Sequence, residues 1–354
     1  MFNDLYDIPC HFARASQDIP SSQNWLRREW EEARKLTEGN SKAILVVDEI
    51  QMVTQWSSIV KAMWDEDADK DRELLVLLTG SSSLLLHKGL RESLTGRFEL
   101  HHCLQWSLEE CRNAFNFTLE DYLYFGGYPG AAPLKGDKNR WLNYMMESII
   151  EPSISRDVIS LDDIHKPALM RSLFSLGAAY SGQEISYRKL MGQLDDAGNA
   201  TTIAHYLDLL SSAGLLSGLQ KYSPKILKTR ASSPRLIAHD TSLMVAMYGQ
   251  YRDFLLTDPE RKGHLVESAV GAYLLKRAQQ EHFEVFWWRE GTSEVDFVVQ
   301  DGRNCTAIEV KSGRIKNTHG LDSFHKAFSN NHNIVVGSSN TSLKDFLLGK
   351  IPLF

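Results

Sequence analysis

Two neighbouring acids, Asp48 and Glu49, follow a run of apolar residues in the segment AILVVDE, residues 43–49. Continuous apolar runs are typical of strands in a parallel sheet, and ligands bind where such strands end. There an aspartate can hold the Mg²⁺ that bridges nucleotide phosphates, and the next glutamate can polarise the attacking water. The alternative is that both acids meet solvent or cap a helix, because apolar strands that end in Asp-Glu are common.

Polar residues also follow the next apolar run, residues 74–78. Thr79 and Ser81 come directly after it, where a hydroxyl would sense a γ-phosphate held beside the first pair of acids. Arg97 follows an expected helix, in the position of an arginine finger that reaches the phosphate of a neighbouring subunit. Taken alone, Arg97 is better explained as a surface residue that pairs with Glu92 or Glu99.

A second acidic group lies in EVDFVVQDGRNCTAIEVK, residues 294–311. The turn at Asp301-Gly302 predicts a hairpin that brings Asp296 beside Glu309 and Lys311. Two carboxylates and a lysine suit a hard cation such as Mg²⁺, with the lysine stabilising phosphate chemistry. A solvent-facing hairpin is the alternative, but an aspartate inside an apolar run is costly without a partner. On the first strand, alternation predicts one face with Glu294, Asp296 and Val298 and an opposite face with Val295, Phe297 and Val299. On the second strand, it predicts a shared face for Ala307, Glu309 and Lys311.

The spacing D-x12-E-x-K resembles the PD-(D/E)xK nuclease fold, and Glu267 on a preceding helix matches the additional acid of that fold. The expected order of helix, strands, hairpin and a helix near Leu321 agrees with it. The resemblance implies a Mg²⁺-dependent phosphodiesterase site at Glu267, Asp296, Glu309 and Lys311. The fold also occurs as an inactive binding module, in which Lys311 would only pair with the acids.

A basic stretch without acids precedes this region. Three expected helices lead to it and a short strand at 235–238 follows, an outline that resembles a winged helix-turn-helix. Its cations would neutralise DNA phosphates, although the helix at 201–212 has no arginine or paired amides for reading bases. A solvated loop, or a winged helix that contacts protein, explains the stretch equally well. The five cations are Lys221, Lys225, Lys228, Arg230 and Arg235.

The elements that position these residues follow from periodicity and turn signals. Apolar residues behind Ser21-Ser22 predict a capped helix, and apolar strands alternating with helices predict a parallel sheet covered on both faces. The segment FGGYPG breaks the chain, and Pro152 should bend or interrupt a helix from about 138 to 158. Further helices are expected at 164–179, 187–194, 201–212 (capped by Asn199) and 265–278, and strands at 284–288, 293–300, 305–311 and 333–336.

The segments VVDEIQ, LLTGSSSLLL, ESLTGRFEL and FGGYPG, in that order, resemble prokaryotic AAA+-type ATPases that carry a C-terminal domain of unknown function. The similarity runs from residue 1 to about 315. It implies an ATP-binding protein that self-associates through its ATPase-like domain. By this resemblance Asp48 is the magnesium ligand, Glu49 the catalytic glutamate, Thr79 or Ser81 the sensor and Arg97 the finger.

The phosphate-binding loop G-x-x-x-x-G-K-[ST] of that family occurs nowhere in the 354 residues. In the family this loop precedes the acid-tipped strand, so we expect a chain that is truncated at its N-terminus or whose start is misassigned. The loop's amides and lysine supply most of the hold on the β- and γ-phosphates, which an aspartate and a hydroxyl cannot replace. A working ATPase whose upstream part is missing from this sequence is the alternative.

Composition is that of a globular protein, with 43% hydrophobic residues, 24% charged residues and a net charge of −6. This excludes wholesale disorder and also excludes binding to nucleic acid by bulk charge. The longest apolar runs have about five residues, far short of a membrane span. The four scattered cysteines form no C-x-x-C pair, so we expect a cytoplasmic protein without a membrane segment.

We therefore predict an α/β chain of four segments. They are a partial P-loop NTPase (AAA+-like) parallel-sheet domain at 1–118, a helical lid or linker at 119–160, a winged helix at 161–250 and a small α/β nuclease-like domain at 251–354. The expected function is that of a DNA-associated AAA+ family protein with a nuclease-like Mg²⁺ site. The competing interpretation is a non-enzymatic interaction or DNA-binding module whose sites are vestigial.

We predict that this polypeptide neither binds nor hydrolyses ATP appreciably, because its sequence encodes no phosphate-binding loop. Titration calorimetry with Mg²⁺–ATP should show no heat of binding above the dilution control. A micromolar dissociation constant would contradict the prediction.

Overall fold

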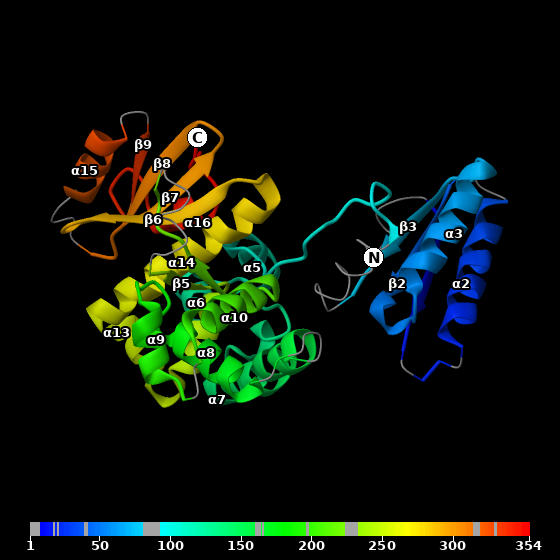
Figure 1. Cartoon of the computed structure of the whole chain (residues 1–354), viewed down its shortest axis with the longest axis horizontal. Helices are drawn as coiled ribbons and strands as arrows, with labels where there is room; N and C mark the ends of the chain where they lie inside the picture. Colours follow the sequence, from blue (N-terminus) through cyan, green and yellow to red (C-terminus); the bar gives the residue numbers. More distant parts are fainter. Residues whose placement is uncertain are drawn as a thin grey trace. The chain divides into compact units, whose positions relative to one another are not determined.

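The computed structural model describes most of the chain, and Figure 1 shows it as a ribbon. It divides into two compact units, Met1–His101 and His102–Phe354. None of the helices described is long and apolar enough to span a membrane. The described residues are 8–16, 18–19, 21–38, 42–80, 93–159, 164, 166–195, 198–223, 233–313, 319–328 and 331–354.

The first unit contains a parallel sheet of the order β1–β2–β3, as the alternating strands and helices predict. Two helices pack side by side against one face of this sheet (Figure 1), because alternate strand residues and the apolar sides of both helices form one core. The elements are β1 (Cys10–Arg14), α2 (Ser22–Thr37), β2 (Ala43–Asp48), η1 (Ile50–Met52), α3 (Trp56–Asp69) and β3 (Leu74–Leu78).

Two expectations about this unit are not met in full. The face of the sheet away from the helices is covered at the central strand, where Ile44 and Val46 are buried, but Phe12 and Leu75 on the flanking strands are 60% and 52% exposed. Ser21 precedes α2, but its backbone is left-handed with φ 53° and its side chain makes no capping hydrogen bond. The amphipathic pattern of α2, rather than a serine cap, therefore accounts for this helix.

A buried polar cluster joins α2 to α3. Trp30 Nε1 donates to Asp67 Oδ2 at 2.7 Å, and Arg34 Nε lies 2.7 Å from Asp67 Oδ1. Arg34 and Asp67 are each only 4% exposed. A buried ion pair is sensitive to the loss of one partner, since the other charge is then left without compensation.

The second unit begins with helices, whose bounds are α5 (Leu108–Phe115), α6 (Leu119–Phe125), η2 (Ala132–Leu134), α7 (Lys138–Tyr144), η3 (Met145–Ile150) and η4 (Ser153–Ile159). The last two are wide, π-helical turns on either side of Pro152. Proline has no backbone N–H, so it interrupts the regular hydrogen-bond ladder. The predicted disturbance at this proline is confirmed.

The FGGYPG segment docks onto Asp240. Gly127 N donates to Asp240 Oδ2 at 2.8 Å, and Ser242 N donates to Asp240 Oδ1 at 2.9 Å. Gly126 has φ +69°, and a Cβ there would lie 1.8 Å from Asp240 Oδ1. The glycine is therefore required by close packing as well as by its backbone conformation.

Three helices and an antiparallel strand pair follow. Asn199 Oδ1 accepts a hydrogen bond from Thr202 N at 2.9 Å, which confirms the predicted cap. The elements are α8 (Pro167–Ala179), α9 (Tyr187–Gln193), α10 (Ala200–Ser212), β4 (Leu216–Leu219) and β5 (Arg235–Ala238), followed by α12 (Thr241–Met247), η5 (Gly249–Tyr251) and α13 (Phe254–Thr257).

The chain ends in a four-stranded sheet of the order β6–β7–β8–β9, antiparallel except for the β8–β9 pair. The predicted hairpin between β7 and β8 is present, with Asp301 opposite Asn304. One face of the sheet packs with α14 and α16, and the other with α15. The bounds are α14 (Pro259–Glu281), β6 (Glu284–Glu290), β7 (Ser293–Asp301), β8 (Asn304–Val310), α15 (His319–Ala327), β9 (His332–Val336) and α16 (Leu343–Leu347).

Beside a smaller core beneath α15, one large core extends through most of the second unit. Its buried residues run from Leu108 to Leu353 and include members of α8, β5, α14 and β8. The three segments expected at 119–160, 161–250 and 251–354 therefore share one core. The division between the two units lies after His101, earlier than the end of the expected segment 1–118.

We expect Asp67→Ala to destabilise the first unit by about 3–5 kcal/mol, because it leaves the buried Arg34 without its partner. Hydrogen exchange of the β2 amides should then be less protected by roughly 100-fold to 4,000-fold, at about 1.4 kcal/mol per factor of ten. Asp69→Ala, an exposed acid in the same helix, is the control and should change protection little. Equal effects of the two variants would show that the buried pair has no special role.

Candidate functional site

The ends of β2 and β3 bring Asp48 and Thr79 together. Thr79 Oγ1 donates to Asp48 Oδ1 at 2.6 Å. Arg14, the last residue of β1, lies opposite Asp48 in the sheet, and its Nε is 3.3 Å from Asp48 Oδ2. Glu49 follows with a left-handed backbone, φ 57°, and accepts a hydrogen bond from Gln51 Nε2. Ser81 lies outside the described residues.

Arg97 pairs within its own unit. Its Nε lies 3.2 Å from Asp65 Oδ1, and its guanidinium lies 5.7 Å from the centre of the Trp64 ring. The partner is thus an acid of α3, whereas the surface interpretation of the sequence named Glu92 or Glu99. A role of Arg97 toward a neighbouring subunit remains a prediction.

Asp296 lies at a β-bulge in β7. Val295 pairs with Trp288 and Val298 pairs with Phe286, so two residues of β7 face the single residue between them on β6. A bulge of this kind re-aims side chains and shifts the alternation of the strand. Val295 and Val298 consequently share the core beneath α15, while Phe297 and Val299 belong to the other core. The predicted grouping of Glu294, Asp296 and Val298 against Val295, Phe297 and Val299 is wrong for this reason.

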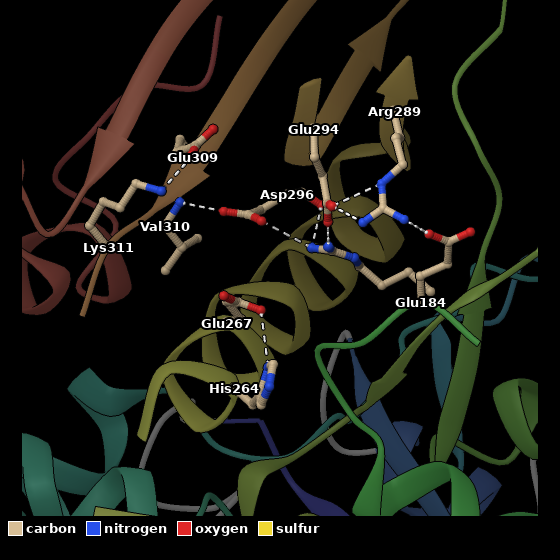
Figure 2. Close-up of polar contacts among 10 residues, drawn as sticks. Glu184, His264, Glu267, Arg289, Glu294, Asp296, Glu309, Val310 and Lys311 are labelled. Carbon is tan, nitrogen blue, oxygen red and sulfur yellow. Dashed lines mark hydrogen bonds and ion pairs between the residues drawn. The ribbon is translucent and has the colours of Figure 1, made fainter. Parts of the chain in front are cut away.

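Both oxygens of the Asp296 carboxylate have protein partners (Figure 2). Oδ2 accepts a hydrogen bond from the backbone N–H of Val310 at 2.8 Å, which ties β7 to the end of β8. Oδ1 accepts one from Arg235 Nη1 at 3.2 Å. Asp296 is therefore placed beside the E-x-K segment, as the hairpin predicts.

Glu309 and Lys311 pair with one another at the end of β8. Lys311 Nζ donates to Glu309 Oε1 at 2.5 Å, and the buried Glu309 Oε2 has no hydrogen-bond partner among the described residues. Burial, followed by the negative charge of Asp296, raises the pKa of Glu309. Burial is the largest influence on Lys311 and acts to lower its pKa. The hydrogen bond that Lys311 donates to Glu309 and the negative charge of the surrounding acids together outweigh burial, so the pKa of Lys311 is raised.

Glu267 faces this group from α14 (Figure 2). Burial is the main cause that raises the pKa of Glu267, and the charge of Asp296 adds to it. His264, one turn earlier, has its Nδ1 3.6 Å from Glu267 Oε2, and this contact raises the pKa of His264. Glu267 thus shares the electrostatic environment of Asp296 and is itself paired with a histidine.

Arg235 is placed differently from the expectation that it contacts DNA phosphates. It is 4% exposed, and it bonds to Asp296 and to Glu294. A buried, paired guanidinium is not accessible to a nucleic-acid backbone, which corrects that part of the basic stretch. Lys221, two residues after the end of β4, forms an isolated bridge with Trp287 of β6. Lys225, Lys228 and Arg230 lie outside the described residues.

A chain of charges lies behind Asp296 and has no signature in the local sequence. Arg289 contacts both Glu294 and Glu184, and Arg235 connects Glu294 to Asp296. The signal in the sequence was the acid Glu294, two residues before Asp296. Nothing local indicates that Glu294 pairs with arginines of β5 and β6. Nor does it indicate that Arg289 also contacts Glu184, which lies before α9.

The acids described above could supply only some of the ligands that a hard cation needs. Among the residues that the structure describes, no group of three or more His, Cys, Asp and Glu side chains could hold a metal ion. Mg²⁺, however, is usually held by one or two carboxylates together with water and phosphate oxygens. Asp296 and the unpartnered Oε2 of Glu309 fit that requirement. Asp48 offers a single carboxylate that Thr79 and Arg14 already contact.

Three family models match consecutive parts of the chain. An AAA domain matches residues 9–112, a domain of unknown function (DUF8612) matches residues 116–253, and a second domain of unknown function (DUF4143) matches residues 262–351. The AAA domain at the N-terminal end and DUF4143 at the C-terminal end support an AAA-like ATPase family.

The similar curated proteins are themselves uncharacterized. One from Methanocaldococcus jannaschii is 25% identical over 285 residues, which cover 75% of this chain and 60% of that protein. One from Haemophilus influenzae is 24% identical over 324 residues, which cover 85% of this chain and 74% of that protein. A crystal structure of a Vibrio cholerae protein aligns over 98% of this chain and 92% of its own, at 14% identity and a TM-score of 0.17; it supports no argument about the fold.

We expect the stability of Glu267→Gln to increase relative to that of wild type as the pH rises from 4.5 to 8. Below its ordinary value of 4.5 the glutamate is protonated in both the folded and the unfolded chain. Above it, the unfolded chain ionises freely while burial opposes ionisation in the folded chain, so wild-type stability falls as the pH passes the raised pKa. His264, whose pKa is raised by this contact, changes stability in the same direction.

The measurement is the melting temperature of both proteins across this pH range. Glu284→Gln, at an exposed acid at the start of β6, is the control and should follow the wild-type curve. A constant difference between Glu267→Gln and wild type at all pH values would contradict the raised pKa.

Proposed function

We propose that the second unit carries a Mg²⁺-dependent phosphodiesterase site for DNA, in a protein of an AAA-like ATPase family. The observation that carries this proposal is the position of Asp296 against the backbone of Val310, the last residue of β8, which lies between Glu309 and Lys311 in the sequence. Glu267 on the facing helix adds the fourth residue of a PD-(D/E)xK pattern. The unpartnered oxygen of Glu309 supports a ligand at this place.

The roles of the side chains follow from their charges. Asp296 and Glu309 would hold Mg²⁺, which when bound supplies Lewis-acid stabilisation of phosphate and activation of water. Lys311 keeps its proton at neutral pH, because its pKa is raised by Glu309. It therefore serves to neutralise phosphate charge at Nζ and does not act as a general base. Glu267 faces the cation site from α14 and contributes a negative charge there only above its raised pKa.

DNA is the proposed substrate because of the segment before the site. Three helices, α8 to α10, lead to the antiparallel pair of β4 and β5, an order that supports a winged helix. The sequence between the two strands contains Lys221, Lys225, Lys228 and Arg230 and no acid. Cations of this kind would contact the phosphate backbone without reading bases.

The first unit contributes an AAA-like fold to this proposal, and ATP turnover by this polypeptide is not part of it. Asp48 and Thr79 stand where a magnesium ligand and a sensor would be needed. The sequence contains no loop to hold the phosphates beside them. Self-association through this unit would involve Arg97, which is now paired with Asp65.

A second candidate function is a non-enzymatic interaction module. It is favoured by the saturation of the acids: Asp296 bonds to Arg235 and to Val310, and Lys311 bonds to Glu309. Such pairs compensate the buried charges without a metal ion. In that case the pattern of acids would be a structural remnant.

The purified chain should nick supercoiled plasmid DNA in Mg²⁺ and should not do so in EDTA. Asp296→Asn and Lys311→Met should each lower the rate by about 100-fold or more, as expected when charge stabilisation is removed from a reacting phosphate. Asp301→Asn, at the exposed hairpin turn of the same strand, should retain the wild-type rate.

No nicking by the wild type would favour the interaction module. Nicking that persists in Asp296→Asn would assign the activity to a different site or to a contaminating nuclease.

A further inference from the structure

Arg235 is a buried cation directly behind the candidate site. It is the first residue of β5, in the part of the chain that matches DUF8612, whereas Asp296 belongs to the part that matches DUF4143. Arg235 Nη1 donates to both the backbone oxygen and Oδ1 of Asp296, each at 3.2 Å, and Nη2 donates to Glu294. One guanidinium from the middle of the sequence therefore contacts two acids of β7.

These contacts need an arginine. The planar guanidinium presents several N–H donors in a fixed fork, so it can reach two carboxylates and a backbone oxygen at the same time, which a lysine ammonium cannot do in this geometry. The guanidinium also lies 5.9 Å from the centre of the Trp287 ring, which covers it with apolar surface. At 4% exposure, Arg235 depends on its acidic partners for compensation.

The consequence for Asp296 is a single orientation. Its two oxygens are held from opposite sides, Oδ2 by the backbone N–H of Val310 and Oδ1 by Arg235. Asp296 lies at a β-bulge, where the strand itself does not define the side-chain direction as regular alternation would. The contact to Arg235 supplies the missing constraint. Partners of this kind orient the carboxylates that bind metal ions.

Arg289 offers an internal comparison. It belongs to the same chain of charges and contacts Glu294 from the other side, together with Glu184. Its side chain is 43% exposed, and no contact between Arg289 and Asp296 is present among the described residues. The two arginines thus share one acidic partner and differ in whether they hold Asp296.

We propose that Arg235 is a positioning residue, which holds Asp296 in the orientation that binds a divalent cation. The cation site is therefore completed by β5. This strand lies outside residues 262–351, the matched region that contains Asp296 and Glu309. This inference rests on the proposed function, because it assumes that Asp296 is a cation ligand.

The test measures Mn²⁺ binding to the full chain without DNA, by titration calorimetry and by the loss of the free Mn²⁺ electron paramagnetic resonance signal. Arg235→Lys keeps the charge and removes the fork, and it should weaken Mn²⁺ binding by about 10-fold to 100-fold, as is usual for the loss of a residue that orients a ligand. Arg289→Lys is the matched control and should stay within about twofold of wild type, since it leaves Asp296 in place. Asp296→Asn defines how much of the binding belongs to this site.

A second pair of variants covers the case in which Arg235→Lys does not fold. The double variant Arg235→Gln, Glu294→Gln removes the buried cation together with one of its acids, and Glu294→Gln alone serves as its control. The double variant should lose Mn²⁺ affinity by the same factor, and the single variant should retain it. Circular dichroism and melting temperature confirm that each variant is folded.

The outcomes separate this inference from the proposed function. Mn²⁺ binding that depends on Asp296 and is weakened only by the Arg235 variants supports the inference, even if no DNA is nicked. Equal affinities of Arg235→Lys and Arg289→Lys would overturn it, even if wild type nicks DNA. Absence of any Asp296-dependent Mn²⁺ binding would also overturn it.

Discussion

A buried guanidinium requires anionic partners, and this requirement at Arg235 organises the second unit. Arg235 satisfies it with Asp296 and Glu294, so β5 must stay in contact with β7. A separate contact joins the segment after β4 to β6, where Tyr222 N donates to Trp287 O at 2.6 Å and Trp287 N donates to Gln220 O at 3.2 Å. The strand pair of the middle segment remains a separate sheet that these bonds link to β6. The larger core of the unit includes residues from α5 through to Leu353.

The acids of this unit are buried because backbone segments pack closely around them. Gly320, near the start of α15, is so close to β7 that a Cβ would lie 1.8 Å from Glu294 O, and it would lie 3.4 Å from Glu309 Oε2. This packing excludes solvent from Glu309 and raises its pKa. Acids that are partly desolvated and lie close to one another have raised pKa values, and such pKa shifts are typical of functional sites. Structural ion-pair networks produce the same pKa shifts. The unpartnered oxygen of Glu309 is what distinguishes this group from a fully satisfied network.

The first unit shows a different relation between fold and chemistry. Its parallel strands end at one edge, and this alone brings Asp48 of β2 within hydrogen-bond distance of Thr79 after β3. The sequence contains no phosphate-binding loop of the form G-x-x-x-x-G-K-[ST] to accompany this pair. Arg14 of β1 contacts the remaining oxygen of Asp48 and compensates its charge. The two units therefore place their acids by separate means, one by strand ends and the other by a buried arginine.

Much of the architecture follows from local sequence pattern. The apolar runs before Asp48 and Thr79 predict parallel strands, and because such strands end at a common edge their polar residues were expected to meet, as they do. The turn at Asp301-Gly302 predicts the hairpin that places Asp296 beside the E-x-K segment. Both predictions succeed because residues close in sequence, or in equivalent positions on neighbouring strands, determine them.

The sequence by itself thus determined the identity of the acids, the strands that carry them and the absence of a phosphate-binding loop. The tertiary structure alone revealed the bulge opposite Trp287, which moves Val298 to the face of Val295, and the burial of Arg235 beside Asp296, where it is not exposed to DNA. The physical reason is that a bulge depends on the register between two strands, and the burial of a charge depends on partners about sixty residues away in the chain. Neither the bulge nor the burial of Arg235 can be predicted from the local periodicity of the sequence.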